Sequence, residues 1–562
     1  MVRGLLLLAL LPYSVSAEQQ VLYTVSLQDR SKHFYDVTMA FDAPRDSSTV
    51  QVSMSRWSTG GSQIGDFARY VKGFEARDSD GNLFATRKVD LHTWQVDTMN
   101  SDHVSIHYRV FAESPSRIYA SDISEDGAFL DPGASLMYVQ SMKGRPTSHA
   151  IAIQLTNVPS GWTAATGLTA GPRPFSYTTS NYDRLIESPV LVGTLLTDNF
   201  QEGSARITVA IAPAEPDLEV DALIENVRKI VRSFSDMFGG LPFSNYTFLY
   251  RLPNRPGSSA MERWNSTTIQ LPYSRVMRSR EDFNDLTSHQ FFHAWNTMRI
   301  RQAIRFEPNY SEAVLTKSLW FSEGTTRYYA KLGRMRAGLL SENDFLAAQA
   351  SEILLHQSRP ARLTQSLEDA SWNAPFTVDL WYRSRSNSIE YGNKGALVSF
   401  LLDLAIRDAT GGRRSLDDVM RLMNERFGET GIGYEETDDI LAAVNSVSGQ
   451  DMTWFFDDYI RGTTEIDYER LVEPAGLEVV EIRRSNLDPG FWAERAYGVP
   501  VMVVTAVTTG SSADEGGVEV GDAFVGLDNT DIDAGLETYL AKFETGDTVT
   551  ARFRRGLEDY SP

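Results

Sequence analysis

The sequence predicts a multidomain α+β protein, with an N-terminal β-sandwich, a mainly helical domain and a small β-rich module at the C-terminus. Short runs of alternating apolar and polar residues dominate the chain from about residue 21 to residue 196. Long helical periods begin near residue 217, and short strand-like runs between glycine-rich loops return after about residue 466. A chain of 562 residues has the length for several such domains.

The N-terminal part contains strand-like runs at Val21–Val25 and His103–Tyr108, and turn signals such as Asp80-Gly81-Asn82 separate runs of this kind. This pattern is typical of an antiparallel β domain. His103 and His107 are four residues apart, but alternation with apolar residues places them on a strand. Because that spacing separates them along one face of a strand, we do not expect them to bind a metal together.

The middle of the chain is expected to be largely helical, with Gly-Gly and Pro-rich punctuation between several of the helices, as in residues 238–242 and 411–412. The apolar periodicity predicts helices over residues 220–237, 283–301, 313–335, 394–408, 416–427 and 437–446. In the C-terminal module, strands are expected over residues 501–504 and 548–553.

Residues 1–17 have the three parts of a secretory signal: a basic start, an apolar stretch and small residues before a cleavage position. We therefore expect a secreted or periplasmic protein, in preference to a buried N-terminal helix. No later segment is long and apolar enough to span a membrane as a helix. The chain has no cysteine, so any metal must be held by histidines and carboxylates.

The net charge of −21, from 53 basic and 74 acidic residues, argues against a nucleic-acid partner. The nearest basic cluster comprises residues 275–280 with Arg299 and Arg301. Such a cluster could receive acidic groups of a substrate, but ordinary pairing at the surface is the preferred interpretation.

The most specific functional motif of the sequence lies in a helical run around residues 287–296. His289 and His293 are four residues apart, so one helical face can direct both imidazoles at one Zn²⁺. The residue after the first histidine of such a motif is usually the glutamate that takes a proton from the metal-bound water, and here it is Gln290. Glu323, in the following helical segment, can supply the third ligand. The sequence therefore predicts a site for one zinc ion.

The chain resembles the glycyl aminopeptidase family of zinc metallopeptidases along most of its length after the signal. The resemblance rests on matching segments, which are residues 57–61, 66–69, 289–301, 320–324, 365–367 and 394–398. It implies a thermolysin-like catalytic domain at residues 201–465, after an N-terminal β domain at residues 18–200. Residues 466–562 resemble a PDZ domain through Ser511-Ser512-Ala513 and Val520-Gly521-Asp522. We expect this module either to be shortened by its last strand or to have its sheet completed from elsewhere.

This resemblance assigns roles to individual residues and identifies three departures from the family. His289, His293 and Glu323 match the zinc ligands, whereas Gln290 stands at the general-base position. The family's oxyanion-supporting tyrosine aligns with Gly392, so that Tyr391 would have to replace it. Glu262 and Arg263 match the segment along the substrate, where Glu262 would hold a peptide's amino group and Arg263 replaces a histidine. A structural ion pair of Glu262 with Arg263 or Arg251 is the alternative.

Two functions follow from this combination. The first is a secreted pseudopeptidase that binds peptide or protein N-termini in its cleft, with an extended or C-terminal peptide at the PDZ-like module. The second is an active or altered zinc aminopeptidase that uses metal-bound hydroxide without a carboxylate base. The three departures around one cleft favour the first. For the PDZ-like module, the alternative is a domain that only packs against its neighbour.

Overall fold

The computed structural model describes residues 20–561 apart from several short segments, and the expected signal at residues 1–17 lies outside the described residues. The segments not described are residues 44–46, 58–59, 61–63, 100, 114–119, 141–146, 148, 216, 255–256, 307, 379–384, 482–488, 496–501, 509, 529, 532–539, 541–542, 544–546 and 557. Within the described residues, no helix combines the length and apolarity needed to cross a membrane.

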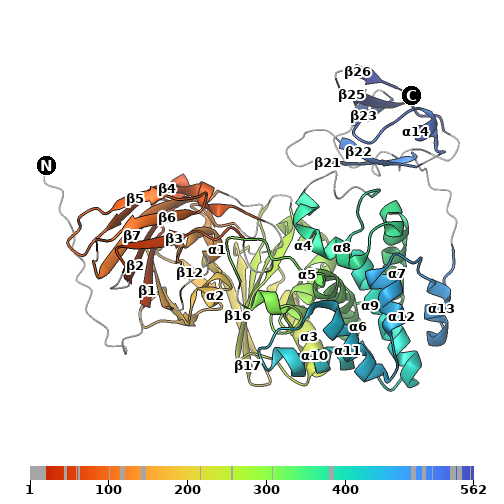
Figure 1. The fold of residues 1–562 in the computed structure, drawn as a ribbon, viewed down its shortest axis with the longest axis horizontal. Helices are drawn as coiled ribbons and strands as arrows, with labels where there is room; N and C mark the ends of the chain where they lie inside the picture. Colours follow the sequence, from red (N-terminus) through yellow and green to blue (C-terminus); the bar gives the residue numbers. More distant parts are fainter. Residues whose placement is uncertain are drawn as a thin grey trace.

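The N-terminal β-rich domain is built on a seven-stranded sheet in the order β13-β14-β11-β1-β2-β7-β4 (Figure 1). Two four-stranded sheets, β10-β3-β6-β5 and β12-β15-β9-β8, complete it, and apolar residues between Val21 and Val192 form its core. The strands are β1 (Gln20–Ser26), β2 (Phe34–Asp42), β3 (Thr49–Ser53), β4 (Val71–Arg77), β5 (Ala85–Lys88), β6 (Thr93–Asp97), β7 (His103–Phe111), β8 (Asp122–Ile123), β9 (Gly127–Leu130), β10 (Tyr138–Val139), β11 (Ala150–Thr156), β12 (Thr163–Thr166), β13 (Thr169–Ala170), β14 (Ser176–Thr179) and β15 (Val190–Gly193). Two short helices, α1 (Pro132–Ser135) and α2 (Tyr182–Ile186), lie among them.

His103 and His107 both lie on β7, as expected, and each faces a carboxylate of the neighbouring strand β2. His107 pairs with Asp36, and the Nδ1 atom of His103 is 3.4 Å from an oxygen of Asp42. The two histidines therefore form separate cross-strand contacts with different carboxylates.

A five-stranded mixed sheet, in the order β16-β17-β18-β20-β19, joins this domain to the helices. Its strands are β16 (Leu196–Glu202), β17 (Ala205–Ala212), β18 (Asn245–Arg251), β19 (Ser259–Glu262) and β20 (Ser266–Gln270). β17, β18 and β20 run parallel, and β19 pairs antiparallel with β20 at the edge. The expected domain boundary between residues 200 and 201 falls inside β16.

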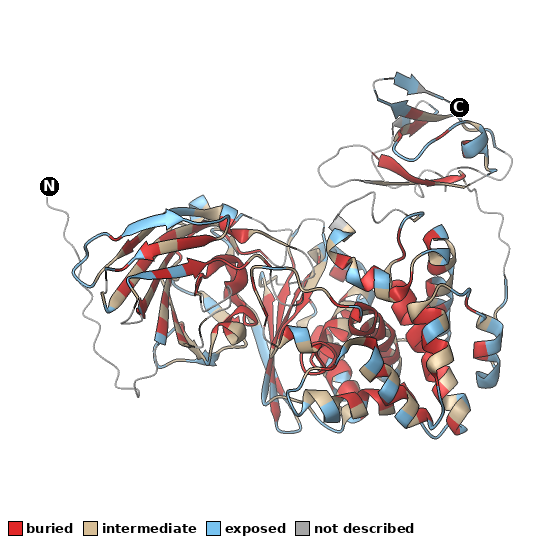
Figure 2. Ribbon diagram, in the orientation of Figure 1, coloured by how far each residue is buried: buried red, intermediate tan, exposed pale blue. Residues whose placement is uncertain are grey.

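Helices cover the mixed sheet and share one continuous core with it, as the buried residues in Figure 2 show. They are α3 (Val220–Phe238), α4 (Tyr273–Arg278), α5 (Glu281–Phe292), the π-helical turn η5 (Trp320–Thr325), α6 (Thr326–Arg336), α7 (Glu342–Gln357), α8 (Leu367–Trp372), α9 (Tyr391–Thr410), α10 (Leu416–Met423), the π-helical turn η8 (Asn424–Gly428), α11 (Glu436–Ser448), α12 (Thr453–Phe456), the π-helical turn η9 (Asp457–Arg461) and α13 (Tyr468–Val472).

Two expected helices are shorter than their apolar patterns predicted. The helix expected over residues 283–301 ends at Phe292, because residues 293–300 fold back into a tight loop in which Thr297 N–H donates to the Ile300 carbonyl. Thr297 has a φ of 104°, which a helix cannot contain. The helix expected over residues 313–335 begins only at Trp320.

The C-terminal module, defined here as residues 490–561, has its own small core of residues between Phe491 and Phe553. Its strands are β21 (Phe491–Arg495), β22 (Met502–Val507), β23 (Ala523–Leu527), β24 (Thr530–Asp531), β25 (Ala551–Arg555) and β26 (Glu558–Tyr560), with one short helix, α14 (Ser512–Glu515). Figure 1 shows this module above the helices. The residues just before it, including Leu471, Val472 and Val479, pack against the helical domain instead.

Candidate metal centre

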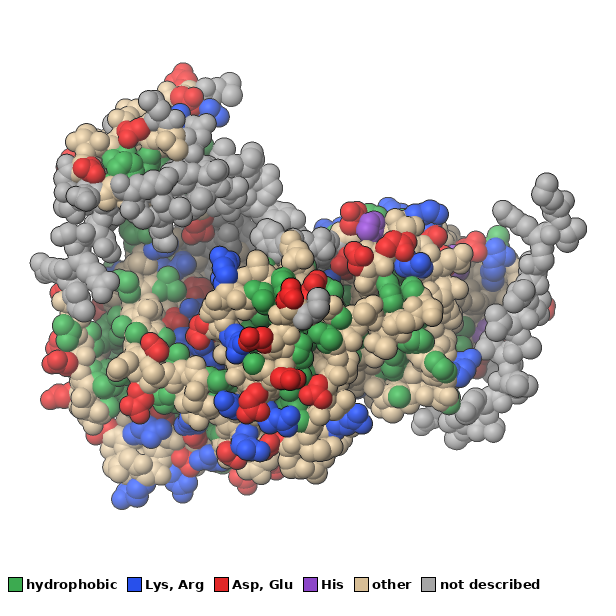
Figure 3. All heavy atoms as spheres, turned by 180° about the vertical axis from the view of Figure 1, so that it is seen from behind, with side chains coloured by type: hydrophobic (Ala, Val, Ile, Leu, Met, Phe, Trp, Pro, Cys, Tyr) green, Lys and Arg blue, Asp and Glu red, His purple; other side chains and the backbone are tan. Residues whose placement is uncertain are grey.

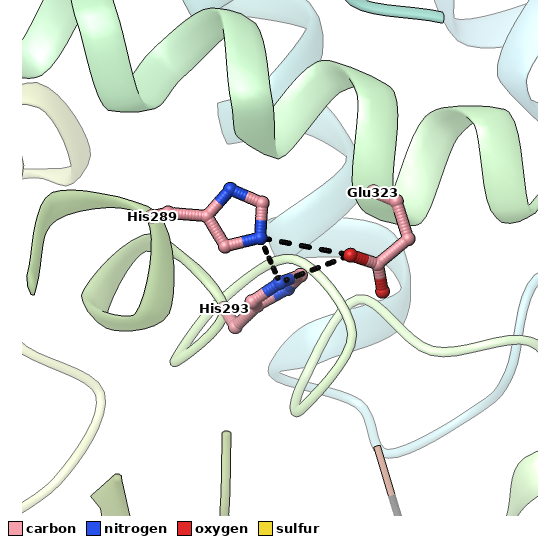
Figure 4. A group of neighbouring side chains, drawn as sticks. All are labelled: His289, His293 and Glu323. Carbon is pink, nitrogen blue, oxygen red and sulfur yellow. Dashed lines mark hydrogen bonds and ion pairs between the residues drawn. The ribbon is translucent and has the colours of Figure 1, made fainter. Parts of the chain in front are cut away.

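The last turn of α5 brings two histidines together. His289 lies inside the helix and His293 caps its C-terminal end, so their rings face one another across one turn. The two Nε2 atoms are 3.1 Å apart (Figure 4). The predicted pairing of these histidines on one face is thus present, although the helix ends at the second of them.

Glu323 completes the group from the facing segment η5. One of its carboxylate oxygens lies 3.6 Å from the Nε2 atom of His289 and 3.6 Å from that of His293. Ligands of a tetrahedral zinc ion, with bonds of about 2.0–2.1 Å, are separated by roughly 3.4 Å. The three donor atoms therefore have the spacing and the chemical types that zinc requires, and they form a cluster of the kind that can hold a metal ion.

The π-helical turn η5 places Glu323 by packing closely against α9. A side chain on Gly324 would bring its Cβ atom within 2.5 Å of the Gly395 backbone, and a side chain on Gly395 would come within 2.5 Å of the Trp320 carbonyl oxygen. Only glycine at both positions permits this approach. Wide single turns of this type often occur at functional sites, where they redirect a side chain.

A buried shell of hydrogen bonds orients the ligands. The Nδ1 atom of His293 lies 2.9 Å from the carbonyl oxygen of Asn296, which leaves Nε2 as the atom that faces the other ligands. The Asn296 amide in turn donates to the carbonyls of Phe321 and Ser322, at 2.8 Å and 3.2 Å. Asn296 therefore ties the loop after α5 to the segment that carries Glu323.

The charges of the site favour a cation between these ligands. Burial alone would lower the pKa of His293, but the carboxylates of Glu262 and Glu323 outweigh it and raise that pKa to about 9. Burial would raise the pKa of Glu323, but His293 and His289 hold it well below its usual range. The site thus attracts a proton where zinc would bind.

A cavity of about 640 Å³ opens beside the three ligands. Two residues of the N-terminal domain, Gly60 and Phe67, form part of its wall. The other lining residues are Ala260, Met261, Glu262, Asp285, Leu286, His289, Gln290, Arg305, Leu319, Glu323, Arg327, Ala330, Lys331, Glu352 and Tyr391. The cavity brings together most of the residues that the sequence predicted for the site.

Two family models match the sequence. The model of the peptidase M61 N-terminal domain covers residues 22–194, and that of M61 glycyl aminopeptidase covers residues 282–398, which includes all three candidate ligands. The chain belongs to the M61 glycyl aminopeptidase family. None of the curated proteins compared with it gives a sequence match.

A solved structure shows the same fold. The aminopeptidase N family protein from Idiomarina loihiensis superposes with a TM-score of 0.84 at 21% identity, over 96% of this chain and 95% of that one. An M1 zinc metallopeptidase from Deinococcus radiodurans has a TM-score of 0.47 at 16% identity, over 80% of this chain and 94% of that one. The first likeness extends the shared fold of this M61 chain over almost its whole length.

Gln290 lines the cavity beside the ligands, where the family resemblance places the general base. Its side-chain oxygen lies 3.4 Å from the hydroxyl of Thr267, which can donate to it. An amide can orient a water molecule, but it has no basic group that takes up a proton near neutral pH.

Glu262 is almost completely buried at the edge strand β19, yet it lines the cavity. Its Oε1 atom has no hydrogen-bond partner among the described residues. The alternative of an ion pair with Arg263 or Arg251 is wrong, because Arg263 pairs with Asp131 and Arg251 with Asp122. Gly60 lies against this carboxylate, since a Cβ atom there would come within 2.8 Å of Oε1.

Arg263 lies apart from the cavity beside which the sequence placed it. Its side chain is only 1% exposed and donates to Asp131 at 2.6 Å, and it does not line the cavity. Asp131 precedes α1 in the N-terminal domain, so this buried pair joins the two domains. Sequence distance hid the partner, which is 132 positions away.

Tyr391 begins α9 and lines the cavity. A tyrosine that replaces the family's oxyanion donor would have to reach this cavity. Gly392 is buried in the first turn of the same helix, and a Cβ atom there would lie 2.7 Å from the carboxylate of Glu390. Gly392 therefore offers no side chain where the resemblance places the family's tyrosine.

In the basic cluster near the motif, Arg275 and Arg280 pair at the surface, as preferred, whereas Arg299 and Arg301 are buried. Arg275 pairs with Asp282, Arg280 with Glu219, and the buried Arg301 with Glu187. Arg299 donates to backbone carbonyls. On the face in Figure 3, acidic and basic side chains are intermixed.

Sequence reasoning missed three cations of the cavity wall: Arg305, Arg327 and Lys331. Arg327 and Lys331 both pair with the buried Glu352. Helical spacing places Arg327 one turn after Glu323 and Lys331 one turn further, which is a signal that could have found them. Arg305 follows the irregular loop after His293, where no periodic pattern indicates its position.

Proposed function

We propose that this chain is an exported, zinc-binding M61 protein that holds the N-termini of peptides or proteins and hydrolyses them slowly. One observation carries the proposal: a complete His289–His293–Glu323 donor set stands beside Gln290 in a cavity that also contains an unpaired carboxylate. A site of this kind keeps the groups that bind and has lost the group that takes the proton.

Different residues of the site would bind the metal and different parts of the peptide. His289, His293 and Glu323 would hold zinc, which when bound polarises a carbonyl group and lowers the pKa of a bound water. Glu262 would receive the ammonium group of a peptide, since its buried Oε1 atom has no partner of its own. Gln290 would hydrogen-bond to a ligand or water without deprotonating it.

A second function, an altered zinc aminopeptidase, is supported by the intact shell of hydrogen bonds around the ligands. His293 and Asn296 keep the contacts that orient a catalytic metal site. In that case the zinc held by His289, His293 and Glu323 would lower the pKa of a bound water far enough that no carboxylate base is needed. Rapid turnover by the natural protein would favour this function.

The C-terminal module is proposed as a second, PDZ-like binding element for an extended or C-terminal peptide. Its sequence resemblance and its small sheet beside α14 support this proposal. A domain that only packs against the helices is the alternative.

Calorimetric titration of the zinc-loaded protein tests the main proposal. The ligands are trialanine with a free amino group and its N-acetylated form, and the variants are Glu262→Gln and, as a control, Glu342→Gln at the exposed start of α7. We expect the natural protein and the control to bind only the free amine, and Glu262→Gln to bind it at least about tenfold more weakly. Equal binding of both peptides by the natural protein would refute N-terminal recognition.

A further inference from the structure

Arg305 is a buried cation of the cavity wall that forms no ion pair within the described part of the chain. It ends the short turn η4 (Ala303–Arg305) and is 8% exposed. Its Nε atom is buried without a hydrogen-bond partner, and no described carboxylate forms an ion pair with its guanidinium. Because arginine cannot lose its charge in a protein, such burial destabilises the fold unless a ligand compensates for it.

The loop that carries Arg305 is fixed from both sides. The backbone N–H of Ala303 donates to the Tyr434 carbonyl at 3.0 Å, and that of Tyr434 donates to the Arg301 carbonyl at 3.0 Å. A side chain on Gly433 would place its Cβ atom 2.2 Å from the Cα atom of Ala303. The backbone that carries Arg305 is therefore positioned before any ligand arrives, which lowers the entropy cost of binding.

The other arginines around the site have partners inside the protein. Arg301, four residues earlier, donates to Glu187 at 2.8 Å, and Arg327 donates to Glu352 at 2.8 Å. Arg299 donates to the Trp264 carbonyl at 2.6 Å. The fold thus satisfies its buried arginines at these positions, and Arg305 differs from them in facing the cavity without a partner.

The carboxylates that act electrostatically on Arg305 are Glu262 and Glu323. Neither forms an ion pair with it, and the proposed function commits Glu323 to the metal and Glu262 to a ligand's ammonium group. A ligand with a negative group near its amino terminus would supply the ion-pair partner that Arg305 lacks. The planar guanidinium can grip a carboxylate with two parallel hydrogen bonds.

We propose that Arg305 binds a carboxylate of the bound peptide, so that the cavity selects ligands with an anionic group within two residues of the N-terminus. This inference rests on the proposed function. The carboxylate can come from the side chain of an acidic N-terminal residue or from the C-terminus of a dipeptide. In both cases the ligand presents an ammonium group to Glu262 and an anion to Arg305.

Three ligands separate these sources in calorimetric titrations of the zinc-loaded full-length protein. They are Glu-Ala amide, Met-Ala amide and Met-Ala with a free carboxylate. We expect Met-Ala amide to bind most weakly, and at least one of the two anionic ligands to bind at least about tenfold more tightly, because a charge-assisted hydrogen bond supplies that much. The tighter ligand identifies the source of the carboxylate.

Two variants test the residue itself. Arg305→Met should abolish the preference for the anionic ligand, whereas Arg305→Lys should keep part of it. Arg305→Met should also unfold at a temperature no lower than the natural protein, because it removes a buried charge without a partner. A purely structural arginine would lower the unfolding temperature when replaced, so this readout separates the two roles.

Equal affinity of the natural protein for the three ligands, or an unchanged preference in Arg305→Met, would overturn the assignment of Arg305 and leave the proposed function intact. If none of the three ligands binds, and trialanine also fails to bind, both proposals fall. Binding of trialanine alone would overturn only the role of Arg305.

Discussion

His293 shows how a single side chain couples this site to pH. It is completely buried, and the carboxylates of Glu262 and Glu323 raise its pKa to about 9 against the effect of burial. In the metal-free protein, the imidazole therefore holds a proton at neutral pH. Zinc must displace that proton, because only the neutral ring has a lone pair for the metal.

We predict that the apparent zinc affinity rises with pH and that the contribution of His293 levels off above about pH 9. Below this pKa, each unit of pH should strengthen binding by about tenfold through this residue, since one proton leaves it for each ion bound. Competition with a chelator of known affinity between pH 7 and pH 10 measures the effect. A zinc affinity independent of pH over this range would contradict the raised pKa.

Residues whose chemistry depends on their identity could be predicted from the sequence. The spacing of His289 and His293 and the amide at Gln290 are visible in five consecutive positions, and Glu323 was found in the following helical segment. Arg305 and Arg263 could not be interpreted in this way. Whether an arginine faces a cavity or pairs with a distant carboxylate such as Asp131 depends on tertiary contacts that no local pattern contains.

At the scale of elements, the site depends on one buried amide that joins two segments. Asn296 lies in the loop after α5, and its side chain donates to two carbonyls of η5 and to the hydroxyl of Thr326. These bonds hold the histidines and Glu323 in register. They also explain why the segment after Phe292 leaves the helix, because a side chain that binds backbone carbonyls elsewhere favours an irregular loop.

We predict that Asn296→Ala lowers the free energy of unfolding by about 2 to 3 kcal/mol, because buried carbonyls lose their donor. Zinc affinity should fall as well, since Glu323 is no longer held against the histidines. Chemical denaturation and a zinc titration measure the two effects. Asn343→Ala, at an exposed position of α7, is the control and should change neither. Unchanged zinc affinity in Asn296→Ala would show that this link does not position the ligands.

The fold's elements were predicted to different degrees. α3 and α11 match their apolar periodicity closely, because each presents one buried face. The π-helical turn η5 was not predicted, because it depends on the contact between Gly324 and Gly395 on separate helices. The early end of α5 was not predicted either. Its apolar pattern continues beyond Phe292 because the loop that follows is also buried.

At the scale of the whole molecule, the N-terminal domain contributes directly to the site. Gly60 and Phe67 line the cavity, and the buried pair of Arg263 with Asp131 fixes this domain beside β19, which carries Glu262. The sheet that joins the domains begins at Leu196, before the expected boundary. The segment that carries the candidate metal ligands therefore depends on the preceding domain for part of the cavity wall.

We predict that Arg263→Met destabilises the protein by about 3 to 5 kcal/mol, because it leaves Asp131 buried without its cation. The double variant with Asp131→Asn should recover part of that loss. Arg30→Met, which breaks the exposed pair with Glu125, should cost less than about 1 kcal/mol. If Arg263→Met and Arg30→Met lower the unfolding temperature equally, the buried interdomain pair contributes no more to stability than the exposed pair.

We propose that the chain keeps a zinc site but lacks its general base. The decisive measurement is the rate at which protein of known zinc content hydrolyses an aminoacyl reporter substrate. We predict one zinc per chain in both the natural protein and Gln290→Glu, with kcat/KM higher by about 10² to 10⁴ in the variant. Gln450→Glu, the same change at an exposed position far from the site in sequence, should have no effect. If the natural protein hydrolyses the substrate as fast as Gln290→Glu at equal zinc content, Gln290 does not limit the reaction, and the loss of a general base is refuted.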